Sequence, residues 1–119
     1  MYTNQIADVA SKHVDNFIGV FPLDKLPNHL PHGGQTRFIV NTDSHNLSGQ
    51  HWIAVSYEKG GIVRAFDPLG VYYPSRLVHY LASSSRRIIF NRSMYQNPTE
   101  KTCGQHCLRW LMWRTSINK

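Results

Sequence analysis

The sequence has little cysteine, little acidic charge and no long apolar run. Of its 119 residues, two are Cys and 7 are Asp or Glu against 13 Lys or Arg, which gives a formal net charge of +6. No apolar stretch approaches the roughly 20 residues that span a bilayer, and the first residues lack the basic and apolar regions of a secretory signal. Cys103 and Cys107 stand four apart, which is poor disulfide spacing on a helix, so we expect an intracellular, reducing compartment.

The length and the pattern of apolar residues predict one α+β domain over residues 1–119. The segment 19–34 combines three prolines and three glycines with several large apolar residues, and is predicted to be an ordered loop. The expected order is helix, three strands, helix, strand, helix, which gives a small mixed or antiparallel sheet packed against helices. The predicted elements are helices 3–18, 73–85 and 103–117 and strands 36–42, 51–57, 62–67 and 86–93.

A β-hairpin is predicted over residues 48–70, with His51 at the start of its first strand and Asp67 at the end of its second. A two-residue loop would put Asp67 on the face away from His51. A three-residue loop over "KGG", with a glycine in the left-handed conformation, would instead pair Ile53 with Asp67 and put His51 and Asp67 on one face as diagonal neighbours. A carboxylate in that position can hold an imidazole in one tautomer, as a catalytic base requires, although a simple surface pair is the alternative.

Cys103 follows a loop and opens the last predicted helix, for which Thr99 or Thr102 is a candidate cap. Free N–H groups and the helix dipole in a first turn lower the pKa of a thiol from about 8.5 toward the roughly 3.5 to 7.5 of reactive cysteines. Gly104 would leave the thiol unobstructed. Gln96, in the preceding loop, is a candidate donor to an oxyanion, together with the backbone N–H of Cys103. Cys107 is expected to be a small buried hydrophobe.

In their order and spacing, "GQHWIAVSYEKGGIVRAFDPLG" and "QNPTEKTCGQHC" resemble the adenain family, the adenovirus-type cysteine endopeptidases, which are related to the SUMO-specific Ulp-type proteases. The resemblance extends from about residue 15 to residue 112. It implies a papain-like or Ulp-like core with the nucleophilic cysteine at the start of a central helix. The acid of this chain, Asp67, is the residue type of the Ulp-type relatives, whereas adenoviral members usually carry Glu at this position.

The resemblance implies specific roles for the site residues. Cys103 is the nucleophile, His51 the general base, Asp67 the orienting acid and Gln96 the oxyanion donor. Trp52, Gly104 and Tyr72 are candidates for substrate contact, although Trp52 also suits sheet packing and Tyr72, like its neighbour Tyr73, suits the core.

By the same resemblance, the substrates are capsid precursor proteins of a virus or virus-like element, in the virion or the infected host cell. We expect a monomer without metal or organic cofactor. One alternative is a Ulp-like protease acting on Gly-Gly ends of ubiquitin-like proteins, and another is an inactive, basic interaction module.

Two further alternatives concern the chemistry of the site. A zinc site would draw its ligands from Cys103, His106, Cys107 and His51, but structural zinc usually takes its ligands in pairs from separate turns. His106 stands three residues after Cys103 and is a rival base, without an acid that the sequence identifies.

The positive charge predicts either a solubility surface or sequence-independent contact with DNA. Adenain-type enzymes use nucleic acid as an activating surface, so the resemblance implies DNA as a non-specific activator. The densest basic groupings are Arg86 with Arg87 and Arg109 with Arg114.

Overall fold

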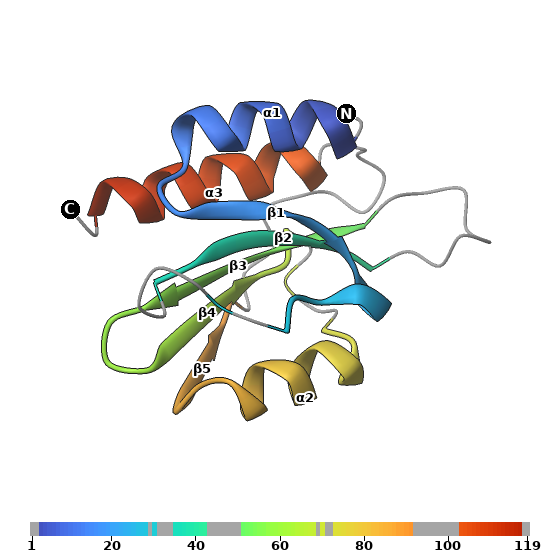
Figure 1. Cartoon of the computed structure of the whole chain (residues 1–119), viewed down its shortest axis with the longest axis vertical. Helices are drawn as coiled ribbons and strands as arrows, with labels where there is room; N and C mark the ends of the chain where they lie inside the picture. Colours follow the sequence, from blue (N-terminus) through green and yellow to red (C-terminus); the bar gives the residue numbers. More distant parts are fainter. Residues whose placement is uncertain are drawn as a thin grey trace.

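The computed structural model describes residues 3–28, 30, 35–42, 51–68, 70, 73–91 and 103–117, without the side chains of residues 3, 4 and 103. A five-stranded mixed sheet lies between helices, which confirms the α+β class. Figure 1 shows helices on both faces of the sheet. The elements, in chain order, are α1 (Thr3–His13), β1 (Phe17–Pro22), the 3₁₀ turn η1 (Leu23–Lys25), β2 (Arg37–Asn41), β3 (Trp52–Glu58), β4 (Ile62–Phe66), α2 (Ser75–Ser83), β5 (Arg87–Phe90) and α3 (Cys103–Ile117).

The strands stand in the order β1-β2-β3-β4-β5. The outer pairs β1/β2 and β4/β5 are parallel, and the two inner pairs are antiparallel. The antiparallel centre follows from the short β3–β4 connection, whereas a parallel neighbour needs a longer crossover, which α2 supplies between β4 and β5.

The prediction missed β1, which lies in the segments expected to be helix and ordered loop. The helix stops at His13, and Asn16 takes the left-handed conformation with φ 60°, which turns the chain back along the sheet. Gly19 and Pro22 fall within β1. Because β1 is an edge strand in this sheet, Pro22 interrupts no ladder between two neighbours, so a proline is tolerated there.

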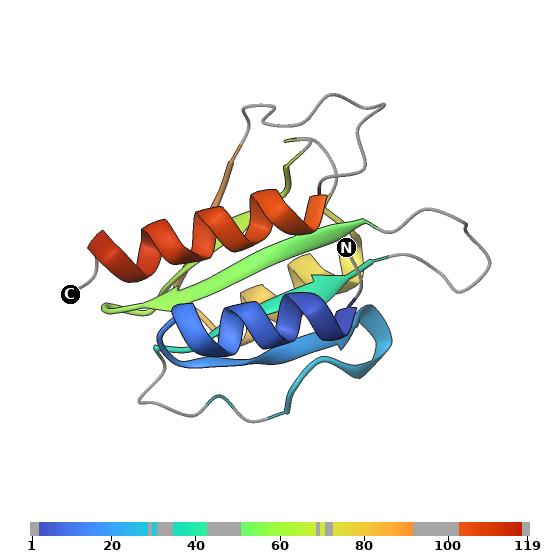
Figure 2. The same cartoon turned by 90° about the horizontal axis from the view of Figure 1, so that it is seen from above.

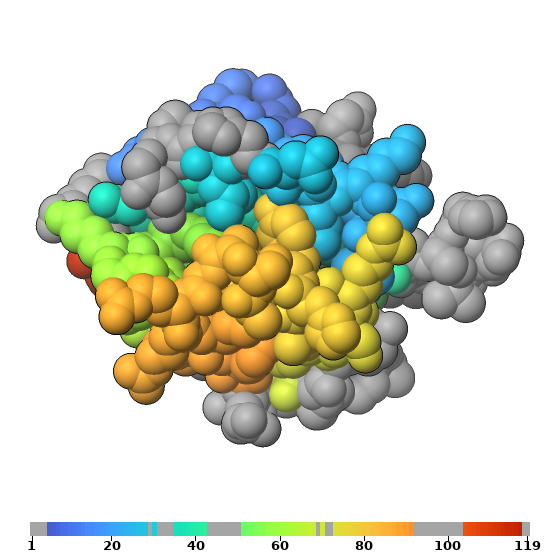
Figure 3. All heavy atoms as spheres, turned by 60° about the horizontal axis from the view of Figure 1, so that its bottom comes forward, coloured from blue at the N-terminus to red at the C-terminus, as the bar shows by residue number. Residues whose placement is uncertain are grey.

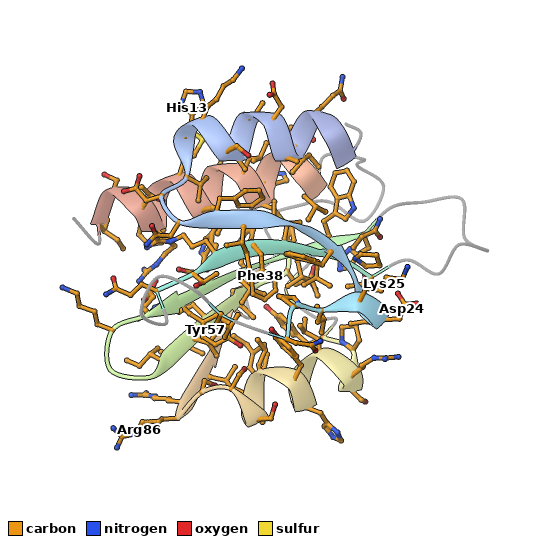
Figure 4. All side chains as sticks on the ribbon, in the orientation of Figure 1. His13, Asp24, Lys25, Phe38, Tyr57 and Arg86 are labelled. Carbon is orange, nitrogen blue, oxygen red and sulfur yellow. The ribbon has the colours of Figure 1, made fainter. Side chains whose placement is uncertain are left out.

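Both faces of the sheet are covered by apolar layers. Figure 2 shows α1 and α3 lying side by side across one face. Figure 3 looks at the opposite side, where α2 lies beside the chain around η1. Phe38 and Tyr57 lie in the layer between the sheet and α2, with ring centroids 6.2 Å apart (Figure 4). Because both faces are buried, β3 is apolar along most of its length rather than alternating.

The helix α3 runs along β3 and determines where the candidate site lies. In Figures 1 and 2 the start of α3 and the start of β3 lie at the same end of the sheet, and the β3–β4 turn lies at the other. The described ranges hold no helix both long enough and apolar enough to cross a membrane.

Candidate active site

The hairpin has the three-residue loop that brings His51 and Asp67 together. Glu58 pairs with Ile62 across the loop Lys59–Gly61, in which Gly60 and Gly61 have φ values of 82° and 74°. The register continues to Ala54 opposite Phe66, which is the register that a three-residue loop predicts. Nε2 of His51 lies 2.9 Å from Oδ1 of Asp67. The sequence prediction of this juxtaposition is therefore confirmed.

Both partners are held in place at the end of the sheet. The carbonyl of His51 accepts hydrogen bonds from the N–H of Thr42 at 2.9 Å and from its hydroxyl at 3.1 Å. Asp67 begins a tight turn, because its carbonyl accepts the N–H of Gly70 at 2.8 Å. The Asp67 side chain is fully buried, whereas the His51 side chain is 16% exposed. The imidazole thus retains access to solvent, whereas the carboxylate beside it has none.

The first turn of α3 packs directly on the strand that follows His51. A Cβ built on Gly104 would lie 2.5 Å from Cε3 of Trp52, closer still to Cζ3 of that ring, and 2.6 Å from Cδ1 of Ile6. Only glycine allows this approach. Gly104 and Trp52 are the chain neighbours of Cys103 and His51, so their contact brings the first residue of α3 toward the strand that carries the imidazole.

Trp52 and Gly104 therefore have a packing role, and the expectation that they contact substrate is corrected. Trp52 is 2% exposed and Gly104 is buried, so each is covered by the other elements of the fold. Gln96 and Tyr72, the other residues predicted to contact reacting groups or substrate, lie outside the described residues.

The second cysteine behaves as the sequence predicts. Cys107 is fully buried, and its thiol donates to the carbonyl of Trp52 at 3.3 Å. It belongs to the apolar layer between α3 and the sheet. Cys103 is the first residue of α3, as predicted, although its side chain lies outside the description.

The outer side of α3 forms an aromatic and basic groove beside β4. A cavity of about 480 Å³ is lined by Phe66, His106, Arg109, Trp110 and Trp113. The rings of Phe66 and Trp110 stack with centroids 5.2 Å apart. His106, the rival base, lines this groove. The carboxylate of Asp67 contacts His51 instead.

Among the described residues, no cluster of three or more His, Cys, Asp or Glu side chains is placed to hold a metal ion.

A buried ion network fastens the other end of α3 to the sheet. Arg114 donates to both carboxylate oxygens of Glu58, at 2.8 Å and 2.6 Å, and Arg64 donates to one of them at 2.9 Å. Burial alone would raise the pKa of Glu58, but the hydrogen bonds from Arg114 and Arg64 outweigh it and hold this pKa below its ordinary value. Arg114 is only 8% exposed, so the expectation that it contacts DNA is corrected.

Two residues that the sequence did not associate with Asp67 hold its backbone. Tyr73, predicted to lie in a groove or in the core, and Asn91, to which no role was assigned, both hydrogen-bond the backbone of Asp67. Burial raises the pKa of Tyr73, so its hydroxyl stays protonated. Asn91 reaches Asp67 only through the continuation of β5 beside the end of β4, which no short motif encodes.

The sheet and its helices share their fold with a protease of known structure. Among solved structures, the chain resembles the ASFV pS273R protease with a TM-score of 0.71 and 14% identity, over 99% of this chain and 58% of that one. A selenomethionine form of the same protease matches with a TM-score of 0.55 and 17% identity, over 66% of this chain and 34% of that one. The chain thus spans little more than half of that protease. No family model and no curated protein matches the sequence.

Proposed function

We propose that the protein is a cysteine endopeptidase of the adenain type. The observation that carries this proposal is the 2.9 Å contact between His51 and Asp67, at the end of the sheet where α3 begins with Cys103. The shared fold with the pS273R protease supports it.

The contact to Asp67 assigns a direction to proton transfer. In the neutral ring, a carboxylate beside Nε2 favours the tautomer with its proton on that nitrogen, which leaves the basic lone pair on Nδ1. Nδ1 then takes the proton of the Cys103 thiol, and Asp67 stabilises the imidazolium that forms. The thiolate attacks the peptide carbonyl carbon, and the imidazolium gives the proton to the leaving amine. Water then hydrolyses the thioester and releases the second product.

The oxyanion needs donors, for which we propose the side-chain amide of Gln96 and the backbone N–H of Cys103. Preformed donors at such a position stabilise charge that develops only in the transition state. The cycle needs no metal and no organic cofactor.

We propose capsid precursor proteins of a virus or virus-like element as substrates, cleaved during maturation in the virion or the infected cell by a monomeric enzyme. The second candidate is a protease that cleaves after the Gly-Gly ends of ubiquitin-like proteins. It is favoured by one feature of the site, namely that its acid is Asp67, the residue type of the Ulp-type relatives.

Duplex DNA is proposed as a non-specific activating surface. Arg86, Arg87 and Arg109 are exposed, and Figure 4 shows Arg86 pointing outward at the end of the sheet. Arg109 lines the aromatic groove on α3, where none of the described lining residues carries a carboxylate.

The test is cleavage of a panel of Gly-Gly-containing peptides beside ubiquitin-like substrates. Wild-type protein should cleave at least one of them, Cys103→Ala should cleave none, and Cys107→Ala should keep activity because Cys107 serves packing. Peptide cleavage alone supports the maturation role, whereas cleavage of the ubiquitin-like substrates alone supports the second candidate. Equal turnover by Cys103→Ala and wild type would refute the proposal.

A further inference from the structure

Asp67 lies beyond the last strand pairing that could hold it. The strand β4 ends at Phe66, and its pairing with β5 ends at Ala65 opposite Phe90. A fully buried carboxylate at the loose end of a strand would lose its aim at His51 unless other groups fixed its backbone.

The side chain of Asn91 replaces the missing ladder. The Asn91 N–H continues the β4–β5 ladder by donating to the carbonyl of Ala65 at 3.2 Å. Its side-chain Nδ2 then donates to the carbonyl of Asp67 at 2.8 Å, and its Oδ1 accepts the Asp67 N–H, also at 2.8 Å. One amide thus engages both backbone polar groups of Asp67, which needs a donor and an acceptor on the same side chain.

Tyr73 holds that amide in its orientation. Its hydroxyl donates to Oδ1 of Asn91 and also accepts the N–H of Asp67 at 3.1 Å. Its ring packs on Phe90, with centroids 4.5 Å apart. The Asp67 N–H can only donate and the Asp67 carbonyl can only accept, so they determine which end of the Asn91 amide is the acceptor. The hydroxyl of Tyr73 adds a donor to that acceptor, and the ring fixes the hydroxyl to β5.

We propose that Asn91 and Tyr73 are positioning residues that aim the carboxylate of Asp67 at Nε2 of His51. For turnover this inference rests on the proposed function, but for the geometry of the imidazole it does not. Neither residue contacts the reacting atoms in this scheme, and each acts through Asp67.

The first test needs no substrate. The ¹⁵N shifts of the His51 ring report which nitrogen carries the proton. Wild-type protein should show the Nε2–H tautomer, and Asn91→Ala should show a mixture of tautomers. Asn91→Asp keeps the acceptor but lacks the donor, so it should resemble Asn91→Ala. A pure Nε2–H tautomer in folded Asn91→Ala would overturn the inference.

The second test compares two tyrosines that each lose one hydroxyl. Tyr73→Phe removes the hydroxyl at Asp67, whereas Tyr80→Phe removes one that donates to the carbonyl of Pro27 at 2.6 Å on the α2 side. Tyr73→Phe should lower kcat and leave KM unchanged, and Tyr80→Phe should change neither. Asn91→Ala should lose up to about 10²-fold in kcat, the scale that misplacement of a catalytic group costs.

Equal losses of kcat in Tyr73→Phe and Tyr80→Phe would show a general loss of stability and would overturn the inference. If wild-type protein cleaves no peptide, the proposed function fails while the tautomer measurement still decides the role of Asn91.

Discussion

Substituting Gly104 by Ala tests how closely α3 packs on the strand that carries His51. The added Cβ would lie within 3.0 Å of Trp52 and Ile6, which are 2% and 0% exposed. Neither neighbour has room to retreat, so overpacking should cost about 1–3 kcal/mol. Alanine regains up to about 1 kcal/mol over glycine in a helix interior, and less in a first turn. The clash therefore dominates, and we expect a net loss of about 1–2 kcal/mol from these two effects.

The assay is urea unfolding in one buffer. With m values of about 1–3 kcal/mol/M, the midpoint should fall by roughly 0.3–2 M while m is unchanged. Gly60→Ala is a matched control, because Gly60 has φ +82° and no neighbour within 4 Å of its added Cβ among the described residues. It should cost about 1–2 kcal/mol through backbone conformation alone, and it should leave kcat of the folded protein unchanged, whereas Gly104→Ala should lower kcat.

A compensating change makes the same test stricter. Trp52→Phe shortens the ring that meets the added Cβ, so in the double variant the loss should be smaller than the sum of the single losses by at least about 0.5 kcal/mol. A Gly104→Ala variant as stable as wild type, or more stable, would refute the packing described at the start of α3.

Glu58→Gln should destabilise the fold by about 3 kcal/mol near pH 7, since it breaks a buried ion network and leaves Arg114 without its carboxylate. Because the folded-state pKa of Glu58 is lowered, its stabilising contribution is present above the unfolded pKa and is lost as pH falls through the folded pKa; the gap in stability between wild type and Glu58→Gln should therefore close in acid. Arg109→Ala should weaken DNA binding and flatten its salt dependence, by about 0.9 in the slope of log K for each phosphate that the variant no longer neutralises. An equal effect of Arg114→Gln in a folded variant would contradict the buried position of Arg114. Gln96→Ala should lower kcat by roughly 10²-fold with KM unchanged, and a change confined to KM would instead assign Gln96 to substrate binding.

Much of the fold was predictable because local signals agreed with the final structure. The "KGG" loop fixed the register of the hairpin, and with it the meeting of His51 and Asp67. The helix from Cys103 to Ile117 was predicted with its observed bounds. In contrast, β1 carries the signals of a loop, and its edge position, which tolerates Pro22, exists only in the assembled sheet.

The predicted site was least accurate where a role depends on packing between distant segments. A tryptophan after a histidine is compatible with substrate contact, and only the approach of Gly104 shows that Trp52 is buried. Asn91 carries no signal in its own neighbourhood, because its partner Asp67 is 24 residues away and becomes adjacent only through the β4–β5 pairing. In the sequence Arg114 resembles a surface charge, because its partner Glu58 is 56 residues away and becomes its neighbour only in the folded protein.

The most direct measurement is the order in which the two cysteines react. A limiting dose of iodoacetamide near neutral pH, followed by mass mapping, should label Cys103 first and leave the buried Cys107 unmodified. In His51→Ala the labelling of Cys103 should slow, because the base that accepts the thiol proton is gone. Preferential labelling of Cys107, equally slow labelling of both, or labelling of Cys103 that is indifferent to His51 would contradict a Cys103–His51–Asp67 site.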